Sequence, residues 1–227
     1  MGARRTLRRW HVRLGWIVGL PILFWTLSGV VMVLKPIEEV RGEALLAKPS
    51  PVRIAQTPVP PALGGIRFNS LSLESRAEGP RWIIALPDGT TRRADPESGL
   101  LMPPLSAADA AREVAARYAG TAKVAAVSRT DPAKPPIDLR RPIPTWRVVY
   151  DDGTYFYVDA RSGAIVATRT RWWRFYDWMW GLHIMDLGER EDTSNAWMRI
   201  FGIAALAMSL LALVLLPLTL KRRGNGS

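Results

Sequence analysis

The chain of 227 residues contains no cysteine and only two histidines, His11 and His183. Without cysteine it can form no disulfide bond, thiolate zinc site, iron–sulfur cluster or thiol nucleophile. The sequence also lacks an HExxH motif, a GxSxG motif and a glycine-rich phosphate loop. Metalloprotease, serine hydrolase and P-loop chemistry are therefore not expected, and the two histidines are the main candidates for metal chemistry.

Charged residues are absent from two long apolar runs, at 14–34 and at 200–220. At about 1.5 Å rise per residue, each run can cross roughly 30 Å of hydrocarbon as a helix. Each run contains one proline, and packing against a neighbouring helix can satisfy the backbone groups that it frees. The first run is too long for the apolar part of a signal peptide, and no small-residue cleavage site follows it. We therefore predict transmembrane helices at 14–34 and 197–220, the first being an uncleaved signal anchor.

Basic residues flank these runs toward both ends of the chain. Five arginines between Arg4 and Arg13 precede the first run, and Lys221, Arg222 and Arg223 follow the second. By the positive-inside rule, 1–13 and 221–227 are expected in the cytoplasm, and the segment between the spans on the opposite side of the membrane. These flanks account for most of the +11 formal charge. The charge therefore indicates membrane topology and implies no nucleic-acid partner.

The segment between the runs contains a duplication. PRWIIALPDGTTRRADPESGLL, at 80–101, aligns without a gap on PTWRVVYDDGTYFYVDARSGAI, at 144–165. Each copy has an apolar run, an Asp-Gly turn, a second run and a Ser-Gly turn, which predicts an antiparallel hairpin leading into a third strand. The aspartates and glycines are the residues that such turns require, so we do not interpret them as metal ligands.

A helix is expected before the second hairpin. The segment LSAADAAREVAARYAG, at 105–120, begins with a capping box formed by Ser106 and Asp109 and ends in a glycine. For the first copy, 37–47 can supply a helix, although a proline-rich stretch follows it. The prediction is an α+β membrane protein, in which two helix/hairpin repeats at 37–104 and 105–170 are flanked by the transmembrane helices.

An aromatic segment, RWWRFYDWMWGLHIMDL at 171–187, follows the second repeat and contains His183. Its tryptophans and tyrosine are typical of the belt that anchors proteins at a membrane surface. Trp172, Tyr176, Met179 and His183 fall at helical spacing. The segment is therefore expected to be an interfacial helix, in which an incidental histidine remains one interpretation.

These residues carry a family resemblance. The run YVDARSG, at 157–163, follows a helix and a hairpin and resembles the PepSY domain. The run WHVRLG, at 10–15, directly before a span, resembles the PepSY-associated membrane family, as does GLH at 181–183. This resemblance implies a protein of the bacterial inner membrane, with both termini in the cytoplasm and a double PepSY-like module in the periplasm. PepSY domains also occur in peptidase propeptides and in ferrisiderophore reductases, which are larger, have four spans and hold haem between their helices.

The two histidines are candidate axial ligands of haem b. His11 precedes the first span and His183 the second, so about 30 Å of hydrocarbon separates them and they cannot share one iron within a chain. A twofold homodimer would bring each histidine to its own copy. The first hypothesis is a homodimeric, haem-dependent reductase that transfers electrons across the membrane to a ferric chelate in iron uptake.

The alternative hypothesis is a non-enzymatic, membrane-anchored module that binds or regulates a peptide, protease or envelope complex. Under this hypothesis both histidines are incidental, His11 in a basic interfacial stretch and His183 in an aromatic one. Small residues on both spans, such as Gly29 and Gly202, permit close helix contact in the lipid. They suit a homo-oligomer or a larger complex under either hypothesis.

Overall fold

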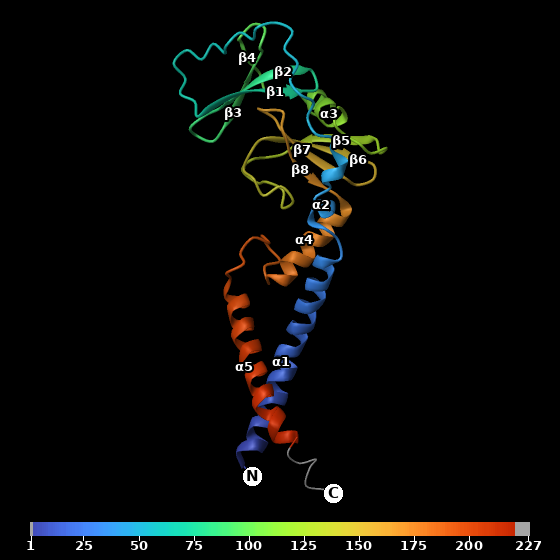
Figure 1. Ribbon diagram of the computed structural model, residues 1–227, viewed down its shortest axis with the longest axis vertical. Coiled ribbons are helices and arrows are strands. Elements are labelled where there is room, and N and C mark those ends of the chain that lie inside the picture. The colour runs from blue at the N-terminus through green and yellow to red at the C-terminus, as the bar shows by residue number, and fades with distance from the viewer. Residues whose placement is uncertain (1, 221–227) are drawn as a thin grey trace. The chain divides into compact units, whose positions relative to one another are not determined.

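The structure is a computed structural model that describes residues 2–220 (Figure 1). The predicted cytoplasmic tail at 221–227 lies outside the described residues. The chain divides into two compact units. Unit 1 combines the chain up to Pro36 with the chain from Phe175 onward, and unit 2 is Ile37–Arg174. As the sequence predicts, the fold is α+β, with apolar helices at both ends flanking a segment rich in β-sheet.

Unit 1 contains the two helices that are long and apolar enough to cross a membrane. They are α1 (Gly2–Val33) and α5 (Ala196–Leu220), which lie side by side and run in opposite directions (Figure 1). Large apolar side chains on both point outward, among them Trp16, 83% exposed, and Ile203, 71% exposed. A continuous apolar surface of this kind needs lipid or another protein to cover it.

Unit 2 contains two antiparallel sheets of four strands each, in which every strand pairs with the next along the chain. No crossover is needed, because each pair of neighbouring strands is antiparallel and joined at one end of the sheet, by short turns except for the longer connection at 130–144 between β5 and β6. The first sheet contains β1 (Ser70–Arg76), β2 (Gly79–Ala85), β3 (Thr91–Ala94) and β4 (Leu101–Met102), and the second contains β5 (Val124–Arg129), β6 (Thr145–Tyr150), β7 (Tyr155–Asp159) and β8 (Ile165–Arg169).

The duplicated segments form equivalent strand pairs. Trp82 pairs with Ala94 in the first sheet, and their aligned counterparts Trp146 and Val158 pair in the second. The Asp-Gly turns also match, since the backbone N–H of residue i+2 donates to the aspartate in each, at 2.9 and 2.8 Å. The local sequence therefore sets the same register twice.

A helix accompanies only the second sheet. Helix α3 (Ala107–Ala115) begins at a complete capping box, in which Ser106 and Asp109 bond reciprocally. Its Val114 packs into a core with Val148 and Phe156 of the second sheet. Burial of these side chains removes apolar surface from water and holds the helix on the sheet.

The candidate helix of the first copy belongs instead to the second core. The segment 37–47 forms only α2 (Ile37–Val40) and η1 (Glu43–Leu45), because Gly42 interrupts it with a φ of 66°. Leu45 and Leu46 then pack against the core of the second sheet. The first sheet is covered by a loop, through Leu63 and Ile66.

The turn glycines of the two hairpins provide a matched test. Gly89 and Gly153 have φ values of 77° and 81°, which disfavour valine by about 1 kcal/mol or more. A Cβ at Gly89 meets no atom within 4 Å, whereas one at Gly153 lies 2.5 Å from Arg171 Nε. We expect both valine variants to unfold at lower temperature, Gly153→Val by the larger margin, as measured by tryptophan fluorescence. Unchanged midpoints for both would show that these turns tolerate side chains and that the assignment is wrong.

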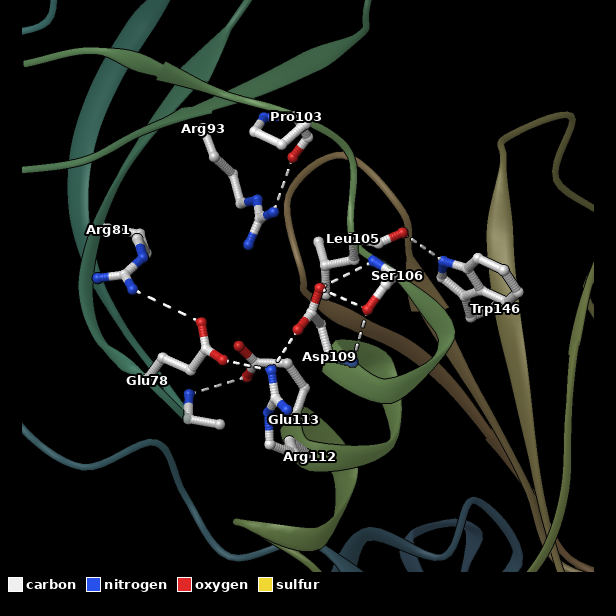
Figure 2. A network of polar contacts seen from close by, with 11 residues as sticks. Glu78, Arg81, Arg93, Pro103, Leu105, Ser106, Asp109, Arg112, Glu113 and Trp146 are labelled. Carbon is white, nitrogen blue, oxygen red and sulfur yellow. Dashed lines mark hydrogen bonds and ion pairs between the residues drawn. The ribbon is translucent and has the colours of Figure 1, made fainter.

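A polar network joins α3 to the turn between β1 and β2 (Figure 2). Glu78 forms ion pairs with Arg81 at 3.7 Å and with Arg112 at 2.5 Å. Glu113 is buried and accepts a hydrogen bond from the backbone N–H of Ala77 at 3.1 Å. Burial raises the pKa of Glu113 above its usual value, because the charged form loses hydration.

The raised pKa of Glu113 predicts a pH-dependent stability. A carboxyl whose pKa is higher in the folded state stabilises the fold below its unfolded pKa, and this contribution is lost as pH rises through the folded pKa. Glu113→Gln keeps an oxygen for Ala77 and stays neutral, so we expect a higher unfolding temperature at pH 7 but no gain at pH 4. The matched control is Glu78→Gln on the exposed side of the network, which should bring no gain at pH 7. A lower midpoint for Glu113→Gln at pH 7 would contradict the prediction.

Candidate functional site

His183 ends helix α4 (Arg171–His183) and packs against α1 within unit 1. Its ring stacks on the Trp25 ring, with the centroids 4.7 Å apart and the planes at 19°. Its Nδ1 lies 3.1 Å from both the Ser28 hydroxyl and the Trp25 carbonyl oxygen. A Cβ on Gly29 would lie 3.3 Å from the imidazole, so a glycine there lets the ring approach the helix closely.

These contacts favour one tautomer of His183. The Ser28 hydroxyl donates to the Trp25 carbonyl at 2.8 Å, which leaves the serine oxygen free to accept. Both neighbours of Nδ1 are then acceptors, so the proton belongs on Nδ1 and the lone pair on Nε2. His183 is partly exposed, and its Nε2 makes no hydrogen bond within residues 2–220. Histidines that ligate metals usually have this arrangement, with the second ring nitrogen donating to a carbonyl or carboxylate.

The loop after α4 is tied back to that helix. The buried Asp177 carboxylate accepts from Arg190 at 2.8 Å, and the Trp180 indole donates to the Arg190 carbonyl at 3.1 Å. The Asn195 side chain donates to the Ile184 carbonyl and also caps α5 by accepting from the Met198 N–H. These bonds fix the end of α4 and thereby the position of the His183 ring.

His11 lies on α1 at a different level from His183. Its Nδ1 is buried and has no hydrogen-bond partner in the part of the chain that the structure describes. Ser28, which contacts His183, lies further along the same helix. At about 1.5 Å per residue, His11 and Ser28 are separated by about 25 Å along the helix axis. One chain therefore does not bring its two histidines together.

The contact between His183 and α1 is the feature that the sequence analysis missed. The pattern indicates an interfacial helix, whereas the imidazole contacts Ser28 within the apolar run at 14–34. At about 1.5 Å per residue, that contact lies about 9 Å from the end of the run at Leu34. The sequence signals for it are a serine and a glycine within an apolar run, Ser28 and Gly29, and Ser28 is fully buried in the structure.

The donors available limit the kind of metal group that unit 1 can hold. Within residues 2–220, no three His, Asp or Glu side chains gather to form a metal site. A bare ion needs several protein ligands, whereas a haem iron needs only axial ones, because the macrocycle supplies the rest. A single imidazole with a free Nε2 fits an axial ligand.

Comparisons with known proteins identify the family to which the chain belongs. No curated protein and no solved structure matches the chain. One family matches residues 1–214, nearly the whole chain, and its description is the PepSY-associated TM region. Two helices long and apolar enough to cross a membrane, Arg5–Val33 and Ala196–Pro217, agree with that description. The chain therefore belongs to the PepSY-associated transmembrane family.

Proposed function

We propose that this protein binds haem b in the bacterial inner membrane and passes electrons to a periplasmic acceptor such as a ferric chelate. The observation that carries the proposal is the hydrogen bonding of His183, whose Nδ1 faces the Trp25 carbonyl at 3.1 Å. This leaves Nε2 as an available ligand. When bound, haem would supply reversible one-electron chemistry at a potential set by its ligands and surroundings.

The protein residues would hold and shield the ligand. Trp25 stacks on the imidazole and fixes its plane, while Ser28 and the Trp25 carbonyl fix its rotation. A fixed imidazole needs little reorganisation when it binds iron. His11 has no equivalent support, because its buried Nδ1 lacks a hydrogen-bond partner within residues 2–220. Its other ring nitrogen would have to bind the iron, so its assignment as a ligand rests on its position on α1.

A homodimer completes the proposed sites. Each histidine stands alone at its level of α1, and about 25 Å along the axis separates the two levels. A twofold axis would place His183 opposite His183 of a second copy, and His11 opposite His11. The two histidine pairs would then lie near opposite ends of the span, as a route for electrons across the membrane requires.

Absorbance of the purified protein tests the proposal. Protein purified in detergent from haem-replete bacteria should show a Soret band and, after dithionite reduction, sharp bands typical of low-spin haem b. Addition of a ferric chelate under anaerobic conditions should reoxidise these bands. Protein that carries no haem, and takes up none when hemin is added, would contradict the proposal and favour a non-enzymatic module that binds a peptide, protease or envelope complex.

The proposed orientation has a separate test. Arginines precede the apolar part of α1 and Lys221–Arg223 follow α5, so the positive-inside rule places both ends in the cytoplasm. We expect alkaline phosphatase fused after Ser227 to be inactive and green fluorescent protein at the same position to fluoresce. The same reporters inserted near Pro132, in unit 2, should give the opposite result. Active phosphatase after Ser227 would reverse the orientation.

A further inference from the structure

Two cavities meet where the turns of both sheets approach each other in unit 2. They measure about 400 and 650 Å³, which is the size range of small-ligand sites. We call the combined depression the turn groove. Five residues line both of its parts: Asp88, Thr90, Thr91, Pro104 and Arg161.

Two hydrogen-bond donors beside the turn groove lack partners. Thr91 Oγ1 and Arg93 Nε are buried and make no hydrogen bond within residues 2–220. Both residues belong to β3 and, being two apart, lie on the same face of the strand. The Arg93 side chain is 6% exposed, and one of its terminal nitrogens donates to the Pro103 carbonyl at 2.9 Å (Figure 2). The Glu113 and Asp109 carboxylates of α3 offset part of the cost of burying the Arg93 charge, and a bound anion would offset more of it.

The remaining charges of the turn groove are also mainly positive. Arg92 and Arg161 line the smaller cavity, and Arg129 and Arg161 line the larger one. Two carboxylates are present, but both bond to their own turns. Asp88 accepts from the backbone N–H and the hydroxyl of Thr90, which holds its pKa below the usual value, and Asp159 accepts from two backbone N–H groups. Both carboxylates keep their charge, and Arg161 also helps to lower the pKa of Asp88, so they offset only part of the positive charge. The lining still holds four arginines against two aspartates: Arg92, Arg93, Arg129 and Arg161 against Asp88 and Asp159.

The second copy of the duplication shows how the equivalent face is filled. In the alignment of the two copies, Tyr155 and Tyr157 stand in place of Thr91 and Arg93. Tyr157 is fully buried, donates to Asp138 at 2.7 Å and packs against Leu139. In the first copy, the loop through Leu63 and Ile66 packs with Ala94, on the opposite face of β3. On the face of Thr91 and Arg93 the first copy has no aromatic rings and borders a cavity.

We propose that the turn groove binds a small organic anion with two or more carboxylates. Arg93 and Thr91 would donate from its floor, and Arg161 from its rim. Carboxylate oxygens can accept from hydroxyl and guanidinium donors together. A small molecule suits the site better than an acidic peptide, because the donors without partners are buried beside the cavity. The site lies wholly in unit 2 and does not depend on haem, although a ferric polycarboxylate would belong to the same ligand class.

Calorimetric titration of the full chain in detergent with citrate tests this site. Citrate should bind, and its affinity should fall as sodium chloride is added, since salt screens the arginines. Triethyl citrate has nearly the same frame without charge and should give no heat of binding. Equal binding of citrate and its ester, or no binding of citrate at millimolar concentration, would overturn the proposal. The Soret band recorded on the same samples reports the haem proposal separately.

Matched variants locate the bound anion. Arg161→Gln should weaken citrate binding about tenfold, the typical contribution of one charge-assisted hydrogen bond. Thr91→Val should weaken it about threefold while raising the unfolding temperature of the free protein, because it removes a buried hydroxyl without a partner. Arg67→Gln, at an exposed arginine outside the groove, is the control and should bind citrate like the parent. If Arg161→Gln and Thr91→Val also bind like the parent, the anion lies elsewhere and the proposal is wrong.

Discussion

His183→Ala should remove a low-spin haem component from the reduced absorbance spectrum of the purified protein. The substitution deletes the only imidazole at that level of α1 and leaves both apolar helices intact. In a symmetric dimer it deletes both axial ligands of one site at once. We therefore expect loss of about half of the haem per chain if both proposed sites are occupied equally. The protein should still fractionate with the membrane, because α1 and α5 provide the anchor.

Two further variants separate ligation from packing. His11→Ala should remove a different spectral component, since the two histidines lie at different levels of α1. Ser28→Ala keeps the Trp25 carbonyl as acceptor for Nδ1–H and should retain haem, with a shifted midpoint potential, because it changes only a group that orients the ligand. If His183→Ala had the parent's haem content and redox response, the electron-transfer proposal would fail, and the ring would serve only to pack α4 against α1.

The hairpin strands of unit 2, which are β2 and β3 in the first sheet and β6 and β7 in the second, could be predicted because their signals are local. The Asp-Gly and Ser-Gly turns recur at aligned positions of the two copies and set the same register in both sheets, with Trp82 and Trp146 at equivalent positions. The conformation and packing of 37–47 could not be predicted in this way. Whether it continues as a helix depends on Gly42, and where Leu45 packs depends on residues far away in the sequence, such as Tyr118.

The candidate sites show the same division between local and distant signals. Scarcity, position before each apolar run and the family-like runs WHVRLG and GLH identify His11 and His183 in the sequence. The tautomer of His183 depends on Ser28 and on a backbone carbonyl of another helix, and neither contact leaves a periodic pattern. The donors without partners at Thr91 and Arg93 are equally hidden, because an arginine on a strand looks like a solvent-exposed residue until the surrounding burial is known.

Asp177→Ala should destabilise the end of α4 strongly. The Asp177 side chain is 5% exposed and pairs with Arg190 at 2.8 Å. Removing one partner of a buried ion pair leaves an uncompensated charge, at a cost of about 3–5 kcal/mol. Arg190 itself has a φ of 60°, a conformation that needs support from its surroundings. Without the pair we expect the loop after α4 to open and His183 to lose its fixed position.

Limited trypsin digestion in detergent measures this opening, because cleavage after Arg190 requires a mobile loop. Asp177→Ala should be cut there at least tenfold faster than the parent if opening is favoured by about 1.4 kcal/mol or more. Glu189→Ala, at an exposed residue of the same loop, is the matched control and should be cut like the parent.

The double variant Asp177→Leu/Arg190→Met no longer buries an unpaired charge, so it should regain most of the thermal stability. Trypsin cannot cut at position 190 in that variant, because Arg190 is absent. The recovery of the double variant is therefore measured by its unfolding temperature and its haem retention. Equal cleavage of Asp177→Ala and the parent would show that the pair does not hold the loop, and the rigidity of His183 would then depend on its contacts with Trp25 and Ser28 alone.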